Sequence, residues 1–313
     1  MTNLRKLLLI IITILLLAGC QKTDFDDNKF NIVTSFYPMY VLTQNVTEGI
    51  EDVQVTNLTA PTTGCLHDYQ ITTQDMIKLS HADALVVNGD GMENFIIKAI
   101  NTYKDLNIVY ASEEIKEKLG KDEHEHEDEH DEEEHDDGHN HEENSHYWVS
   151  ISLYIEQVKN VAEQLGKIDE KNKDLYERNA QKYIEKLTTL KNQMHEELDA
   201  LPNKNIITFH EAFEYFADEF DFDIVAVIER EPGTYPSSKE VAEIIDLVKE
   251  KDVKAVFVEP QYSRSAADTI ARETKVEVYS LDPIVTGSDD ADSYIKIMTE
   301  NMNTLIKALK GSE

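Results

Sequence analysis

Cysteine is scarce in this chain of 313 residues, which contains Cys20, Cys65 and no other cysteine. Cys20 closes an N-terminal apolar segment and is a candidate for lipid attachment, which would leave Cys65 alone. An internal disulfide is then impossible in the mature chain, even in a compartment that permits disulfides. Stability must come from a hydrophobic core, and this length is enough for two domains with a core in each.

Basic residues are the second shortage, because 30 Lys and Arg stand against 62 Asp and Glu and give a formal net charge of −32. This charge argues against nucleic acid and against an anionic membrane surface as binding partners, since both would repel it. A cationic ligand fits the balance better. The alternative is that much of the charge outside residues 122–143 only keeps the protein soluble.

A long hydrophobic run is missing as well. The apolar segment Leu7–Ala18 is too short to cross about 30 Å of hydrocarbon as a permanent helix. A basic pair precedes it and the letters LAGC close it at Cys20, which is typical of a secretory signal with a bacterial lipobox. We expect residues 1–19 to be a signal peptide and Cys20 to carry a diacylglycerol. Residues 20–29 would then tether the protein to the extracytoplasmic face of the cell membrane. A plain signal peptide before a stray cysteine, or a short anchor helix, is the alternative.

Glycine and proline are absent from residues 169–201, where one long amphipathic helix is predicted. Its apolar side chains recur at intervals of three and four, namely Leu175, Tyr176, Tyr183, Ile184, Leu187, Leu190, Met194 and Leu198. Such a helix would be roughly 45 Å long, longer than a small domain is wide. We therefore expect it to be rigid and to join two lobes.

Strand and helix patterns alternate on both sides of this helix, which predicts parallel, doubly wound sheets. The first lobe, residues 30–168, carries strands at 30–36, 53–58, 84–88 and 107–110 and helices at 38–49, 72–79, 92–103 and 150–165. The second lobe, residues 202–313, carries strands at 205–209, 223–228, 253–258 and 276–281 and helices at 211–220, 237–249, 263–273 and 292–309. The predicted fold class is α/β, with roughly four parallel strands in each lobe. The helix of the first lobe that starts at Ser150 is expected to end at Gly166.

Periodicity disappears between Lys121 and Asn144. This segment is rich in Asp and Glu and includes six histidines: His124, His126, His130, His135, His139 and His141. It holds too little apolar surface to order itself, so a disordered surface loop is predicted. The histidines would bind zinc weakly and raise its concentration near a tight site. The alternative is a solvated insertion with no role in metal binding.

Four potential metal ligands lie where strands or the acidic loop end. His67 follows the second predicted strand, His146 follows the loop, and His210 and Asp282 each directly follow a strand of the second lobe. Ligands of open α/β sheets bind outside the carboxyl ends of the strands, so a cation between the lobes could draw on all four. Their wide separation forms no local motif, and a histidine at a strand end is more often an ordinary hydrogen-bonded residue.

The segment that begins at His210 also approaches a zinc-protease motif. That motif needs a second histidine four residues on, and this position is Glu214. The near match therefore gives no support for hydrolysis, and we do not expect an enzyme.

Several longer stretches resemble one known family, the bacterial zinc/manganese ABC-transporter substrate-binding lipoproteins. The matching segments are Thr62–Tyr69 (TTGCLHDY), Thr208–Phe213 (TFHEAF), Glu231–Gly233 (EPG), Pro236–Ser237, Val258–Ser263 (VEPQYS) and Leu281–Pro283. The resemblance covers essentially the whole mature chain, and a histidine-rich insertion is a further trait of the family.

The resemblance implies a ligand set of His67, His146, His210 and Asp282. Zinc importers of the family have histidine at the third position, as here, whereas manganese importers usually have glutamate, and imidazole suits zinc. Some zinc members take the fourth ligand from elsewhere or use water, which is the alternative to Asp282. Cys65 is a possible thiolate ligand, although a small buried thiol is the commoner role.

The sequence thus predicts a monomeric, lipid-anchored receptor that binds Zn²⁺ tightly and delivers it to an ABC permease and its ATPase. A manganese receptor of the same fold is the nearest alternative. A metal-buffering or adhesive surface lipoprotein, with the histidine-rich loop as its active part, is another. An extracellular zinc hydrolase would need an open coordination position and a general base beside it.

Overall fold

Each lobe is built on a parallel sheet of four strands in this computed structural model, which describes residues 25–59, 66, 69–96, 100, 102–123, 144–228 and 236–310. The strands of the first lobe are β1 (Phe30–Thr34), β2 (Val53–Asn57), β3 (Ala84–Val87) and β4 (Asn107–Tyr110). Those of the second lobe are β5 (Asn205–Thr208), β6 (Asp223–Val227), β7 (Ala255–Val258) and β8 (Glu277–Ser280). The predicted fold class is confirmed. Strand β4 has the predicted bounds, and the other strands are one or two residues shorter than predicted, which is the usual uncertainty of element ends.

The two sheets share one topology. Their strand orders are β2-β1-β3-β4 and β6-β5-β7-β8, so in each lobe the first strand lies between the second and the third. The connection that leaves this inner strand and the one that leaves the third strand run in opposite directions along the sheet. The carboxyl ends of these two neighbouring strands therefore form the switch point where doubly wound folds bind ligands. In the second lobe the first of them is β5, and His210 lies just beyond its end.

The helices of the first lobe are α2 (Tyr37–Val46), α3 (Thr73–Ser80), α5 (Ile115–Glu123) and α6 (Ile151–Ile168). Helix α5 was not predicted. A helix was predicted over residues 92–103. Its described part contains the short 3-10 turn Asn94–Ile96 and Ile100, which is helical, whereas residues 97–99 and 101 lie outside the described residues.

Helix α6 continues through Gly166 to Ile168, so the predicted end at Gly166 is wrong. A Cβ at position 166 would lie 3.0 Å from Cγ of Lys173. The glycine therefore permits a close approach of the next helix and does not end α6.

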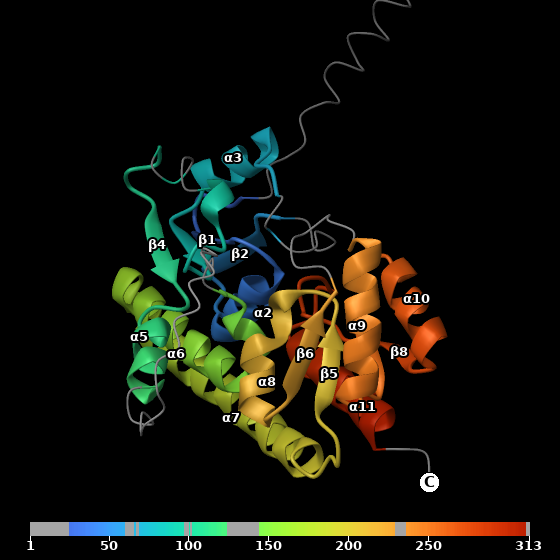
Figure 1. The fold of residues 1–313 in the computed structure, drawn as a ribbon. Coiled ribbons are helices and arrows are strands. Elements are labelled where there is room, and N and C mark those ends of the chain that lie inside the picture. Colours follow the sequence, from blue (N-terminus) through green and yellow to red (C-terminus); the bar gives the residue numbers. More distant parts are fainter. Residues whose placement is uncertain are drawn as a thin grey trace, which may run out of the picture.

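The helices of the second lobe are α8 (Glu214–Phe220), α9 (Ser238–Glu250), α10 (Ser265–Thr274) and α11 (Ser293–Leu309). Figure 1 shows α8 on one side of β5 and β6, with α9 and α10 on the other. Helix α9 begins with a capping box in which Ser237 and Glu240 bond each other's backbone N–H groups. Helix α8 is preceded by a 3-10 turn, Glu211–Phe213, so the predicted helix at 211–220 has an irregular first turn.

The long helix α7 (Lys173–Leu198) joins the lobes as predicted, after a 3-10 turn at Glu170–Asn172. It is roughly 39 Å long. It packs on α2 and α6 of the first lobe and on α11 of the second, and it runs below both sheets in Figure 1. One stripe of the helix is buried: Tyr176, Ala180, Tyr183, Leu187, Leu190, Met194 and Leu198.

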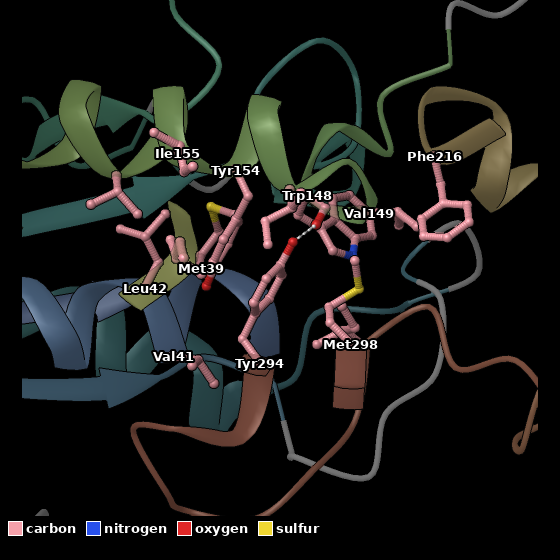
Figure 2. Packing of buried hydrophobic residues seen from close by; sticks show 14 of the residues in the cluster. Met39, Val41, Leu42, Trp148, Val149, Tyr154, Ile155, Phe216, Tyr294 and Met298 are labelled. Atoms are coloured by element: carbon pink, nitrogen blue, oxygen red, sulfur yellow. Dashed lines mark hydrogen bonds between the residues drawn. The ribbon is translucent and has the colours of Figure 1, made fainter. Parts of the chain in front are cut away.

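One hydrophobic core extends through both lobes along this stripe, from Ile32 of β1 to Leu309 of α11. Figure 2 shows its centre, where Tyr154 of α6 stacks on Tyr294 of α11 with ring centroids 3.8 Å apart. The hydroxyl of Tyr294 donates to the carbonyl of Trp148 at 2.9 Å. A separate cluster covers the other face of each sheet. The lobes therefore pack against each other along the connecting helix and are not joined by a flexible hinge.

The predicted acidic loop differs at its two ends from residues 121–144. Residues 121–123 form the end of α5, and Asn144 is held by several hydrogen bonds. Residues 124–143, with all six loop histidines, lie outside the described residues, as do residues 1–24. No helix among the described residues is both long and apolar enough to cross a bilayer.

Candidate metal site

Two of the predicted ligands meet between the lobes. His210 follows β5, and His146 precedes the 3-10 turn Tyr147–Val149 that leads into α6. Their ring centroids are 5.3 Å apart and the rings are nearly perpendicular, at 79°. Each residue is only 4% exposed. Two buried imidazoles at this separation, one from each lobe, form part of a donor set that suits Zn²⁺.

Trp148 connects this pair to the segment that contains Asp282. The rings of His146 and Trp148 are 5.1 Å apart, and the indole N–H donates to the carbonyl of Pro283 at 2.8 Å. Asp282 therefore lies in a segment that is fastened to the neighbour of His146. Its carboxylate accepts the backbone N–H of Ile284 at 2.8 Å.

The environment of Asp282 acts on its protonation in opposite directions. Burial raises the pKa of its carboxyl group, the hydrogen bond from Ile284 opposes this rise, and the negative charge of Glu300 adds to it. A bound cation would favour the ionised form. Among the described residues, no three His, Cys, Asp or Glu side chains are grouped closely enough to hold a metal ion, so Asp282 does not complete a site with the two histidines there.

His67, Cys65 and the loop histidines fall outside the described residues. Leu66, the neighbour of His67, is described and is buried in the shared core. His67 as the first ligand therefore stays a prediction.

Asn144 was missed by the sequence analysis, which placed it at the end of a disordered loop. Its side-chain oxygen accepts the backbone N–H of His146 at 3.0 Å and lies 2.7 Å from Nδ1 of the same residue. Its Nδ2 donates to the carbonyl of Glu211 at 2.8 Å and to Oε2 of Glu214 at 2.7 Å. An Asn two residues before a histidine was the only local signal.

A buried polar network behind His146 was missed as well. The Asn88 side chain donates to the carbonyl of Ser145 at 2.9 Å and accepts from Gln157 at 2.8 Å. Glu93 is 5% exposed and accepts hydrogen bonds from the Ser35 hydroxyl and from two backbone N–H groups. Burial is the main cause that raises the pKa of Glu93, to about 7.

Comparison with known proteins identifies the family. The profile described as "Zinc-uptake complex component A periplasmic" (ZnuA) matches residues 32–308. The chain belongs to this family. It is 34% identical over 307 residues to the "High-affinity zinc uptake system protein ZnuA" of Bacillus subtilis, with 94% of each chain covered.

Other relatives differ in length or in the metal they are named for. The "Zinc-binding lipoprotein AdcA" of Streptococcus pneumoniae (strain R6) is 30% identical over 306 residues, and the match covers 96% of this chain and 60% of AdcA. The "Manganese-binding lipoprotein MntA" of Halalkalibacterium halodurans is 26% identical over 310 residues, with 96% of each chain covered.

Solved structures agree with the fold. A crystal structure of ZnuA has a TM-score of 0.73 at 25% identity, covering 90% of this chain and 100% of that one. Zn(II)-bound AdcA from Streptococcus pneumoniae has a TM-score of 0.72 at 26% identity, with 91% and 58% covered. Membership of the ZnuA family thus rests on sequence and on fold.

Proposed function

We propose that this protein is a high-affinity receptor that captures Zn²⁺ between its lobes and delivers it to an ABC permease driven by an ATPase. The observation that supports this most directly is the buried pair His146 and His210, contributed by different lobes and 5.3 Å apart. A cation held from both sides would bring one imidazole from each lobe together in this way.

The proposed ligands are His67, His146, His210 and Asp282. Asp282 would have to move toward the two histidines when the metal binds, because these three described residues are not grouped closely enough in this structure. Three neutral imidazoles and a carboxylate would hold Zn²⁺ tetrahedrally, with Zn–N distances of about 2.0–2.1 Å. Such a site is closed and leaves no position for a substrate, which suits a carrier and not a catalyst. Protons compete for the histidines, so zinc affinity should fall as the pH drops below about 6.5.

Zinc is favoured over manganese by the histidine at position 210, because manganese prefers more oxygen ligands. The relatives at 30% and 34% identity are named for zinc, and the manganese-binding relative is at 26%. A manganese receptor of the same fold stays the alternative.

We further propose that residues 1–19 are removed, that Cys20 is lipidated, and that the protein acts as a monomer on the extracytoplasmic face of the membrane. The lipobox letters and the lipoprotein names of several relatives support the anchor. Substitution of Cys20 by Ala should release the protein from the membrane fraction.

The buffering or adhesive alternative assigns the metal to the loop histidines His124, His126, His130, His135, His139 and His141. A solved structure of a laminin-binding adhesin from Streptococcus agalactiae has a TM-score of 0.73 at 25% identity, which supports the adhesive form of this alternative. In our proposal the loop binds zinc weakly and is not needed for the tight site.

The first test is a zinc titration of the metal-free protein that starts at Gln21. Trp148 fluorescence monitors the titration, and elemental analysis gives the stoichiometry. We expect one tight zinc equivalent that manganese does not displace. Trp148 fluorescence should report its binding, because the Trp148 ring lies 5.1 Å from that of His146. The substitution His210→Ala should abolish this tight zinc binding. His195→Ala, on the partly exposed face of α7, is the matched control and should retain it.

A deletion of residues 124–142 separates the receptor from the metal buffer. The deletion stops short of Asn144, because that side chain holds His146. Retention of one tight zinc equivalent supports the receptor. Loss of all tight binding with the loop would overturn the proposal in favour of buffering.

A further inference from the structure

The side chain of Asn144 hydrogen-bonds the segments of both histidines. Through Oδ1 it contacts the backbone N–H and Nδ1 of His146, and through Nδ2 it contacts Glu211 and Glu214, which follow His210. Its own carbonyl accepts the hydroxyl of Tyr215 at 2.8 Å. The connection runs from the first lobe to the first turns of the second-lobe segment that begins at His210.

The partners of Asn144 fix which way its amide points. The carbonyl of Glu211 and the carboxylate of Glu214 are acceptors, so the atom that faces them must be the NH₂ group. The oxygen then faces His146 and accepts from the backbone N–H, which is a donor and nothing else. Both ends of the amide agree on this orientation.

The same orientation decides the tautomer of His146. Nδ1 lies 2.7 Å from an oxygen that can only accept, so Nδ1 must carry the proton. In a neutral imidazole the lone pair is then on Nε2, and that is the nitrogen that can bind a metal. A hydrogen bond to the other ring nitrogen is the usual way in which a metal-binding histidine is oriented.

We propose that Asn144 is a positioning residue for the zinc site: it sets the tautomer and ring orientation of His146 and fastens His146 to the segment that follows His210. This inference rests on the proposed function for the identity of the metal, and its assignment of the tautomer can be tested without metal. Substitution of comparable outer partners lowers metal affinity by about 10–100-fold, and we expect a loss in this range for Asn144→Ala.

Two variants separate the two halves of this role. Asn144→Asp keeps an acceptor toward Nδ1 of His146 but replaces the donor toward Glu211 and Glu214 with a carboxylate, which Glu214 repels. Combining it with Glu214→Gln supplies a donor on the other side. We expect Asn144→Asp to retain the tautomer but bind zinc more weakly than the native protein, and the double variant to recover most of the affinity.

The experiment uses the chain from Gln21 with its loop intact. Zinc affinity is measured by competition with a chelator, and the ring-nitrogen NMR signals of His146 are recorded in the metal-free protein at pH 7.5. Asn160→Ala is the matched control, since the Asn160 amide also donates to two carbonyls, those of Ala111 and Glu113, away from the histidines. Urea unfolding shows that each variant is folded.

The proposal expects the Nδ1-protonated tautomer of His146 in the native protein, its loss in Asn144→Ala, and an unchanged zinc affinity in Asn160→Ala. An Nε2-protonated His146 in the native protein, or an Asn144→Ala affinity within about twofold of native, would overturn it. If the native protein bound no zinc tightly, the proposed function would fail, while the NMR signals would still decide whether Asn144 sets the tautomer. If Asn144→Ala does not fold, the proposal is tested by Asn144→Asp alone. A retained tautomer with weaker zinc binding would support the proposal, and native zinc affinity would overturn it.

Discussion

At the scale of single residues, buried polar side chains shape the ends of the strands near the site. Glu93 ties the end of β1 to the turn after β3, because it accepts from Ser35 at 2.8 Å and from the backbone of Asn88 at 2.6 Å and Gly89 at 3.0 Å. Gly89 has a φ of +100°, a conformation that side chains rarely adopt. These contacts hold the loop on which Asn88 supports the carbonyl of Ser145.

Glu93 should make stability depend on pH. Its pKa is raised by burial from 4.5 to about 7 in the folded protein, so folding favours the protonated form. The protonated Glu93 side chain therefore contributes fully to stability below about pH 4.5, and this contribution is lost as the pH rises through about 7. The free energy of unfolding should fall by about 3 kcal/mol over this range. Urea unfolding of the metal-free protein between pH 5 and 8 measures it.

Comparison of variants isolates this contribution. The difference in unfolding free energy between the native protein and Glu93→Gln should change over this pH range. The difference for Glu185→Gln, an exposed position on α7, should stay constant. Equal slopes for native and Glu93→Gln would show that Glu93 does not titrate in this window.

At the scale of elements, α6 is capped from the opposite lobe. The Ser150 side chain accepts the backbone N–H of Leu153 at 3.2 Å, as an N-cap residue should. Glu219 of α8 in turn accepts from the Ser150 hydroxyl at 2.6 Å and from the backbone N–H of Ser152 at 3.1 Å. A carboxylate at a helix N-terminus is favourable because it meets unsatisfied N–H groups and the positive end of the helix dipole.

Glu219→Ala should therefore lower the free energy of unfolding by about 1–2 kcal/mol, because it removes hydrogen bonds to a charged acceptor and a favourable charge at the helix end. Urea unfolding at neutral pH measures the change. Glu163→Ala is the control: this α6 residue pairs with Lys167 at 2.8 Å but is 69% exposed, so the loss should be at most about 1 kcal/mol. Equal effects of the two substitutions would contradict the capping role.

At the scale of the whole molecule, the shared core limits how the lobes can move. Tyr154 and Tyr294 stack across the lobe boundary, and the hydroxyl of Tyr37 donates to the carbonyl of Ser288 at 2.7 Å. A Cβ at Gly287 would lie 2.1 Å from that hydroxyl, so only glycine allows this approach. Metal capture should therefore involve small local shifts and not a wide hinge closure.

The two lobes should also unfold as one unit. Trp148 fluorescence and far-UV circular dichroism should report a single, coincident urea transition, because α7 buries its apolar stripe in a core that both lobes share. Leu187→Ala, at a fully buried position on this stripe, should lower the unfolding free energy by about 2–5 kcal/mol without splitting the transition. Separate transitions for the two probes would show that the lobes are independent.

Elements with a local signal could be predicted from the sequence. Apolar runs predicted both parallel sheets, spacing of three and four predicted the long helix, and short motifs identified the family, because each depends on neighbouring residues. The packing of the folded chain was needed to show that His146 meets His210, that Asn144 joins their segments, and that Glu219 caps α6. Gly166 shows the same limit, since its role depends on how closely Lys173 approaches. These contacts join residues far apart in the chain, and a hydrogen bond between distant residues leaves no periodic pattern in either segment.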